Sequence, residues 1–332
     1  MSAGPDVDGV LVQWGDRLFY PDNRIVRPAP MPRLSGSIAE RAALIRQHIR
    51  ATVVRRAQQV MVKVTGGGRG MAAIAAHFRY ITKNGQRSFE DDRGIVREGK
   101  EALRDLADQW RYGGSFIDET SWRREAFNIM LSMPTGTDPK IVQQAAREFA
   151  RAELGEHRYV MVLHDHQANP HVHISVRAES RHGTRLNPRK ADLQRWRETF
   201  AEKLRGWGIE AEATRQATRG VSRNYLPIWR VKAAAERRLE SERPLERSGE
   251  GFKKSKADAL EAWSRIIDGL SQSSSAEDRA LAAQADRFMR TTDFATDFVR
   301  TRELASKRQQ TRGVSEMQRV VAQHRPGPEI TR

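Results

Sequence analysis

The chain has 332 residues, with 58 lysines and arginines against 42 aspartates and glutamates and a formal net charge of +16. This excess favours a polyanionic partner, because neutralising phosphates releases counterions from nucleic acid. The absence of cysteine excludes disulfides and thiolate ligands, so a bound metal would need imidazole, carboxylate or water. The sequence has neither a long apolar run nor a signal-like start, so we expect a cytoplasmic protein with no membrane insertion.

The changes in composition along the chain predict three regions. Residues 1–58 form an N-terminal extension, in which prolines before residue 33 predict an extended lead-in and a capping-box pattern from Ser37 to Glu40 begins a helix. Residues 59–230 form the main domain. Residues 231–332 are charged, weakly apolar and interrupted by glycine, proline and serine, which predicts helices with flexible joints.

The first half of the main domain predicts two strands and a helix. A short apolar strand at residues 60–64 leads into the glycine-rich loop TGGGRG. The next segment predicts a helix that stops at Asn84-Gly85, because its apolar residues recur at helical spacing, at Met71, Ile74, Phe78 and Ile81. Alternating apolar and polar residues at 127–133 predict a second strand.

The second half of the main domain predicts a helix, a hairpin and a last helix. Asp138 as N-cap and Pro139 after it begin a helix that runs to about Leu154. The segments RYVMVLH and HVHISVR, separated by a short turn region, predict a β-hairpin. Asn187-Pro188 begins the last helix. This order predicts an α+β fold, with a central antiparallel sheet flanked by helices and a helical, partly flexible C-terminal region.

Four of the nine histidines lie within the stretch LHDHQANPHVHISV, at His164, His166, His171 and His173. Side chains two apart in a strand point the same way, so His171 and His173 share one face, and the hairpin brings His164 beside them. Three imidazoles can then converge on one cation and leave positions open for water or substrate, as in a catalytic metal site. A lone histidine is more often a packed or surface residue, but four in ten residues favour metal binding.

A basic protein that holds a divalent cation suggests polarisation of a phosphate, and that chemistry needs a nucleophile. Tyr80 is the candidate because it lies opposite the apolar stripe of its predicted helix and cannot join the core. The alternative is an ordinary surface tyrosine.

The basic and aromatic residues around Tyr80 offer contacts to nucleic acid. Arg69, Arg79, Lys83 and Arg87 could bind phosphates or be solvated charges. Trp110, Tyr112 and Trp122 could stack on unpaired bases, although core packing is the commoner role. The loop TGGGRG lacks the Lys-Ser/Thr ending of a nucleotide P-loop, which argues against ATP binding.

Three motifs in order, GGGRGMAAIAAHFRYITKNG, LSMPTGTD and HDHQANPHVHISV, resemble those of conjugative relaxases of the MOBP class in the HUH endonuclease superfamily. Virulence-operon relaxases that nick T-DNA borders are the nearest likeness. The resemblance runs from about residue 60 to 230 and includes TRGVSRN.

The resemblance implies a DNA relaxase that nicks one strand at an origin of transfer and later rejoins it. Tyr80 matches the nucleophile that becomes joined to the 5′ phosphate, and Ser132 matches a serine associated with substrate contact. His171 and His173 match paired metal ligands, and His164 matches a further motif histidine that is either the base or the third ligand. The implied cofactor is a divalent ion, Mg²⁺ or Mn²⁺, with Zn²⁺ as the alternative.

One position departs from the family pattern, which often has an acidic residue two places after the first motif histidine. Here that position is His166, and the carboxylate is Asp165. Either His166 replaces the carboxylate as a ligand or outer partner, or Asp165 reaches in because a turn has begun.

The resemblance also implies partners: single-stranded DNA at an origin of transfer, relaxosome accessory proteins and a type IV secretion coupling protein. It places the protein in the bacterial cytoplasm, with transfer to the recipient cell while attached to DNA. The basic segment 307–332 is either a secretion signal or an ordinary disordered tail. Two other functions remain open: a rolling-circle replication initiator and a non-catalytic DNA-binding regulator.

Overall fold

The computed structural model describes residues 6–20, 36–166, 169–222 and 249–296. The chain divides into two compact units. One comprises Met1–Tyr20, Leu34–Ala42 and Gln216–Arg332, and the other comprises Pro21–Arg33 and Ala43–Arg215. The predicted limits at residues 58 and 230 stay predictions.

The second unit contains an antiparallel sheet of six strands among the described residues, in the order β2-β5-β7-β6-β3-β4. The strands are β2 (Met61–Gly66), β3 (Phe89–Asp91), β4 (Val96–Arg97), β5 (Ala126–Ser132), β6 (His157–His164) and β7 (His171–Ser180). A two-stranded sheet pairs β1 (Gln58–Gln59) with β8 (Ala211–Glu212). The predicted α+β fold, with its central antiparallel sheet flanked by helices, is confirmed.

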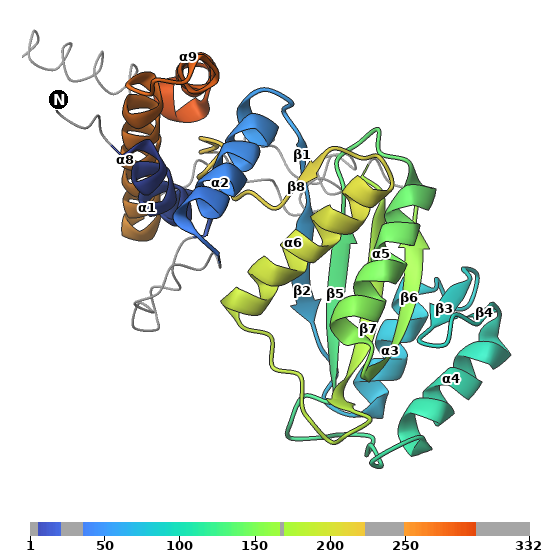
Figure 1. Cartoon of the computed structure of the whole chain (residues 1–332). Coiled ribbons are helices and arrows are strands. Elements are labelled where there is room, and N and C mark those ends of the chain that lie inside the picture. The colour runs from blue at the N-terminus through green and yellow to red at the C-terminus, as the bar shows by residue number, and fades with distance from the viewer. Residues whose placement is uncertain (1–5, 21–35, 167–168, 223–248, 297–332) are drawn as a thin grey trace, which may run out of the picture. The chain divides into compact units, whose positions relative to one another are not determined.

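Alternation along the central strand β7 gives the sheet two different faces. Val172, Ile174 and Val176 enter the larger core, which they share with α5 (Pro139–Leu154) and α6 (Lys190–Gly206). Figure 1 shows α5 and α6 side by side across this face. The opposite face of the sheet contributes to a second core with α3 (Met71–Ile81) and α4 (Lys100–Tyr112). His171 and His173 lie on that opposite face, because side chains two apart share a face.

Local capping explains where the helices begin. Asp138 accepts a hydrogen bond of 2.8 Å from the amide of Lys140 at the start of α5, as expected of an N-cap residue before proline. The side chains of Ser37 and Glu40 bond reciprocally at the start of α2 (Ile38–Val53). α6 begins at Lys190, slightly later than predicted, where the Asp192 carboxylate accepts from the amide of Arg189.

Two helices were not predicted from the sequence. α1 (Val7–Phe19) replaces the first part of the expected extended lead-in, because Asp6 caps the helix and an apolar stripe of Leu11, Leu18 and Phe19 is buried. α4 buries Leu103, Leu106 and Trp110. The predicted core role of Trp110 is therefore confirmed, whereas Tyr112 is exposed.

The helical unit contains α1, α8 (Glu250–Ser271) and α9 (Ala276–Arg290), which agrees with the predicted helical C-terminal region. Phe19 meets Trp263 edge-on at 6.3 Å between ring centroids, and the Trp263 indole donates to the carbonyl of Thr218. No helix in the described parts of the chain has the length and apolar content needed to span a membrane. The predicted secretion segment 307–332 lies outside the described residues.

Replacement of Phe149 by alanine should lower the free energy of unfolding by about 3–5 kcal/mol, because the ring is buried against Trp196 and Phe200. Urea unfolding monitored by circular dichroism measures the change. The matched control is Arg151→Ala on the exposed face of the same helix, expected to change stability by less than about 0.5 kcal/mol. Equal effects of the two substitutions would contradict the assignment of this core.

A candidate metal centre beside a tyrosine

The hairpin of β6 and β7 brings the motif histidines together. His164 is paired directly with His171 across the two strands, and His173 lies two residues further along β7 on the same face. The possible ligand nitrogens of His164, His171 and His173 all lie within 4.8 Å of one another. All three residues are buried. The convergence of three imidazoles expected from the sequence is therefore present in the structure.

One ring nitrogen of His164 and one of His171 are each hydrogen-bonded to a backbone carbonyl. His164 Nε2 lies 2.7 Å from the carbonyl oxygen of Ile81, and His171 Nδ1 lies 2.9 Å from that of Asn169. A carbonyl only accepts, so these two nitrogens carry the protons, and His164 Nδ1 and His171 Nε2 keep their lone pairs. His173 Nδ1 is buried and has no hydrogen-bond partner among the described residues.

Burial keeps the three imidazoles neutral. It lowers the pKa of His164 to about 4 and that of His173 to about 3, and it also lowers the pKa of His171. Neutral imidazoles are the form that binds metal ions. The free lone pairs and the unpartnered nitrogen of His173 fit a cation held by these three side chains.

Tyr80 lies beside the triad on the last turn of α3. Its side chain is 70% exposed, and its ring meets that of His173 edge-on at 6.4 Å between centroids. The next residue, Ile81, supplies the carbonyl that accepts from His164. The helix end that presents the phenol is thus joined by a hydrogen bond to the histidine hairpin.

His77 is a member of this site that the sequence analysis missed. Its ring stacks on Tyr80 at 6.1 Å and meets His173 edge-on at 6.4 Å. Burial lowers the pKa of His77 to about 4, and its Nε2 has no hydrogen-bond partner among the described residues. The available signal was its position three residues before Tyr80, which places both on neighbouring parts of one helix surface.

Ser132 is buried beneath the hairpin, opposite His171 on β5. Its hydroxyl lies within donating distance of the carbonyl oxygens of Pro170, at 3.3 Å, and Met133, at 3.4 Å. These contacts link β5 to the residue just before His171. The expected contact of Ser132 with substrate stays a prediction.

His166 and Asp165 lie outside the triad, on the exposed side of the hairpin end. Arg87 donates to the Asp165 carboxylate at 3.2 Å, to the carbonyl of Leu163 at 3.2 Å and to His166 Nδ1 at 2.8 Å. The hydrogen bond from Arg87 holds the pKa of Asp165 below its usual value. Arg87 therefore organises the hairpin end, and a ligand role for His166 stays a prediction.

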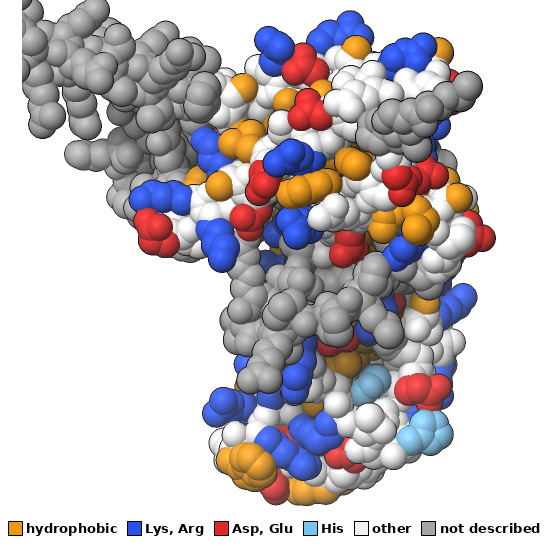
Figure 2. All heavy atoms as spheres, turned by 60° about the vertical axis from the view of Figure 1, so that its left-hand side comes forward, with side chains coloured by type: hydrophobic (Ala, Val, Ile, Leu, Met, Phe, Trp, Pro, Cys, Tyr) orange, Lys and Arg blue, Asp and Glu red, His pale blue; other side chains and the backbone are white. Residues whose placement is uncertain are grey.

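The other three basic residues expected at the site are exposed. Arg69, Arg79 and Lys83 make no side-chain hydrogen bond or ion pair within the described parts of the chain. Across the face drawn in Figure 2, lysine and arginine side chains are interspersed with acidic ones. Positive charge without a protein partner is thus available close to Tyr80, on its own helix and in the turn that follows.

Comparison with known proteins supports the resemblance stated from the motifs. Residues 80–209 match the relaxase family model described as MobA/VirD2-like, nuclease domain. The T-DNA border endonuclease VirD2 of Rhizobium radiobacter is 27% identical over 206 residues, which cover 56% of this chain and 47% of that protein. The chain therefore spans about half the length of this curated relative. These matches confirm the expected relaxase resemblance.

A solved structure that also matches is described as "Molecular Basis of Vancomycin Resistance Transfer in Staphylococcus aureus". It is 15% identical to this chain, with a TM-score of 0.31, and the match covers 48% of this chain and 99% of the solved one.

Replacement of His171 by alanine should weaken Mn²⁺ binding to the full chain by more than about 100-fold. Loss of an outer partner of a metal ligand already costs about 10- to 100-fold, and a direct ligand contributes more. Isothermal titration after chelator treatment measures the affinity. The control is His182→Ala, an exposed histidine paired with Glu156 at 2.8 Å, which should bind Mn²⁺ normally. Unchanged affinity in the His171 variant would exclude it as a ligand.

Proposed function

We propose that the domain whose residues 80–209 match the MobA/VirD2-like relaxase nuclease model nicks and rejoins single-stranded DNA through Tyr80. The observation that carries the proposal is the position of Tyr80, whose ring lies against His173 at the end of a helix hydrogen-bonded to His164. The ring centroids of Tyr80 and His173 lie 6.4 Å apart, so a phosphate bound at Tyr80 would lie beside the residues that would hold a cation.

The reaction is a transesterification in which the number of ester bonds is conserved. The Tyr80 oxygen attacks a phosphorus atom of DNA, a bond from phosphorus to tyrosine forms and the bond to the 3′ oxygen breaks. The phenolic proton is lost, and a proton is gained by the departing 3′ oxygen. The product is a 5′-phosphotyrosine ester, and attack by a 3′ hydroxyl reverses the reaction without ATP.

The triad residues have separable roles in this proposal. A divalent cation held by His164, His171 and His173 would stabilise the negative charge that develops on the phosphate oxygens. The hydrogen bond from His164 Nε2 to the carbonyl of Ile81 favours His164 as a ligand over the base, because it leaves one lone pair on a ring that belongs to a cluster of three possible ligands. His77 is a positioning residue, since its stacked ring limits the directions that Tyr80 can take.

The chemistry of the donors narrows the choice of ion. Mg²⁺ prefers oxygen ligands in octahedral geometry. Imidazole nitrogens suit Zn²⁺ best of the three expected ions, and they suit Mn²⁺ better than Mg²⁺. Three neutral imidazoles with no carboxylate among the clustered donors therefore favour Mn²⁺ or Zn²⁺ over Mg²⁺.

The wider setting follows from the same proposal. VirD2 is a T-DNA border endonuclease, and by analogy this chain would act at an origin of transfer during plasmid mobilisation. Accessory proteins that expose the strand and a type IV secretion coupling protein would be its partners. The protein would act in the bacterial cytoplasm and reach the recipient cell attached to DNA.

The Tyr80→Phe variant should form no covalent adduct with DNA, because only the phenolic oxygen is removed and no other group replaces it. The assay incubates supercoiled plasmid carrying the cognate origin with protein and Mn²⁺, then detects nicking and protein-linked DNA on denaturing gels. Tyr112→Phe is the matched control, an exposed tyrosine on another helix that should retain full activity. Persistence of the adduct in the Tyr80 variant would assign the nucleophile elsewhere.

Replacement of Arg79 by alanine should weaken single-stranded DNA binding uniformly across sequences and reduce the slope of log K against log salt by about 0.7. The reason is that its exposed guanidinium has no protein partner among the described residues and can neutralise one phosphate. Fluorescence anisotropy at several salt concentrations measures the slope. Arg151→Ala, an exposed arginine on α5, provides the comparison. An unchanged slope in the Arg79 variant would remove it from the interface.

A further inference from the structure

The loop between α4 and β5 presents Trp122 almost fully to solvent, with 87% of the side chain exposed. Tryptophan is on average highly buried, because its large ring gains much from leaving water. The exposed indole of Trp122 therefore contributes less to folding stability than the buried indole of most tryptophans. Neither core nor metal site uses this side chain.

The backbone that carries Trp122 is fixed to the first turn of α3. The amides of Met71 and Ala72 donate to the carbonyls of Asp118 and Glu119 at 2.9 and 3.2 Å, and the amide of Ser121 donates to the carbonyl of Arg69 at 3.3 Å. These bonds also occupy helix amides that could otherwise bind a phosphate.

The glycine-rich loop makes this close approach possible. Gly70 has a φ of +97°, and a Cβ there would lie 2.3 Å from the carbonyl oxygen of Glu119. Gly68 accepts from the amides of Glu125 and Ala126, at 2.7 and 3.2 Å. The glycine-rich loop is thus hydrogen-bonded closely to the loop that carries Trp122.

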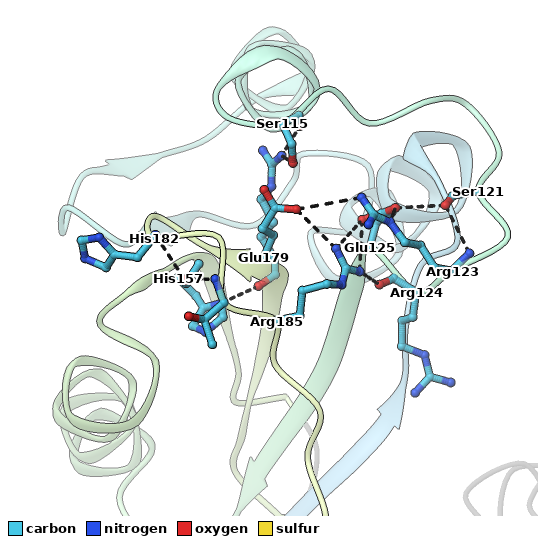
Figure 3. Close-up of polar contacts among 12 residues, drawn as sticks. Ser115, Ser121, Arg123, Arg124, Glu125, His157, Glu179, His182 and Arg185 are labelled. Atoms are coloured by element: carbon cyan, nitrogen blue, oxygen red, sulfur yellow. Dashed lines mark hydrogen bonds and ion pairs between the residues drawn. The ribbon is translucent and has the colours of Figure 1, made fainter.

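A cluster of charged side chains holds the other end of the loop (Figure 3). The buried Glu125 carboxylate accepts from Arg123 Nε at 2.8 Å, from Ser121 Oγ at 3.0 Å and from Arg185 at 3.4 Å. Arg185 also donates to the carbonyl of Arg124 at 2.6 Å. Trp122 therefore projects from a backbone that is fixed on both sides, which reduces the entropy lost when a ligand binds to it.

Two arginines flank this indole without a carboxylate partner among the described residues. The Arg69 side chain is exposed and makes no hydrogen bond or ion pair there. The Arg124 side chain extends away from the Glu125 cluster in Figure 3, and its guanidinium lies 5.1 Å from the centre of the Phe127 ring. In contrast, the nearby carboxylate of Glu119 is paired with Arg111. An exposed ring on a loop that also carries Arg124, and that is hydrogen-bonded to the backbone of Arg69, fits a base and its neighbouring phosphates.

We propose that Trp122 stacks on a base of the single-stranded DNA substrate, while Arg69 and Arg124 contact adjacent phosphates. This inference rests on the proposed function for the identity of the substrate. The nine helical steps from Met71 to Tyr80 span about 14 Å along α3. That is about four nucleotides of a stacked strand, so the base at Trp122 lies outside the nick site itself. Stacking accepts any base, so the contact adds affinity and little sequence preference.

The experiment uses the full chain with a fluorescein-labelled oligonucleotide of twenty thymidines and measures affinity by anisotropy. Trp122→Ala should weaken binding about 5- to 100-fold, and Trp122→Phe should retain most of the affinity because it keeps an aromatic face. Trp207→Ala is the matched control, a partly exposed tryptophan whose indole donates to Glu148, and it should bind normally.

A second readout separates stacking from a structural role. An unlabelled oligonucleotide should quench the tryptophan fluorescence of the parent chain, and Trp122→Phe should lose most of that quenching while its circular dichroism stays unchanged. Normal affinity in Trp122→Ala, or full quenching in Trp122→Phe, would overturn the proposal. If this surface binds a protein partner instead of DNA, Trp122→Ala should likewise bind the oligonucleotide with normal affinity, and the proposal would be overturned.

The failure of this inference is distinguishable from failure of the proposed function. If the parent chain forms the Tyr80 adduct and Trp122 substitutions leave DNA affinity unchanged, only the stacking site is wrong. If no adduct forms with any origin but DNA binding and quenching depend on Trp122, the stacking site stands and the nicking function is wrong.

Discussion

The candidate site depends on one hydrogen bond, from His164 Nε2 to the carbonyl oxygen of Ile81. It joins residues 83 positions apart in sequence and connects the hairpin that carries the histidines to the helix that carries Tyr80. It also sets the protonation pattern of the ring, because the proton on Nε2 leaves the lone pair on Nδ1. A single contact therefore fixes the position of both a possible ligand and the end of the helix that carries Tyr80.

The surrounding fold holds the histidine hairpin in place for this hydrogen bond. β7 is a central strand whose apolar residues pack against α5 and α6 on one face, so the histidines on its other face cannot shift without moving the core. Burial of three imidazoles excludes water and favours their neutral forms, but it leaves His173 Nδ1 without a partner in the described protein. A cation held by these three side chains would offset that cost.

Features that depend on local periodicity could be predicted from the sequence, whereas contacts between segments far apart in the chain could not. Alternation along β7 was enough to place His171 and His173 on one face, and helical spacing was enough to keep Tyr80 out of the core. The partner of His164 could not be predicted, since Ile81 contributes only its backbone. His77 was missed because a lone histidine carries no periodic signal, and α1 was missed because the prolines beyond it dominated the interpretation of the first residues.

The glycine-rich motif has a structural role that its sequence did not reveal. Glycines before a helix suggest phosphate binding, yet here the helix amides are occupied by loop carbonyls and the missing side chains allow that loop to approach. α3 is thereby held at both ends, by backbone bonds at its start and by the His164 bond at its end. A helix fixed in this way keeps a constant spacing between Trp122 and Tyr80. Under the proposed function, this constant spacing would make the part of the DNA strand that binds at Trp122 determine which phosphate reaches the Tyr80 hydroxyl.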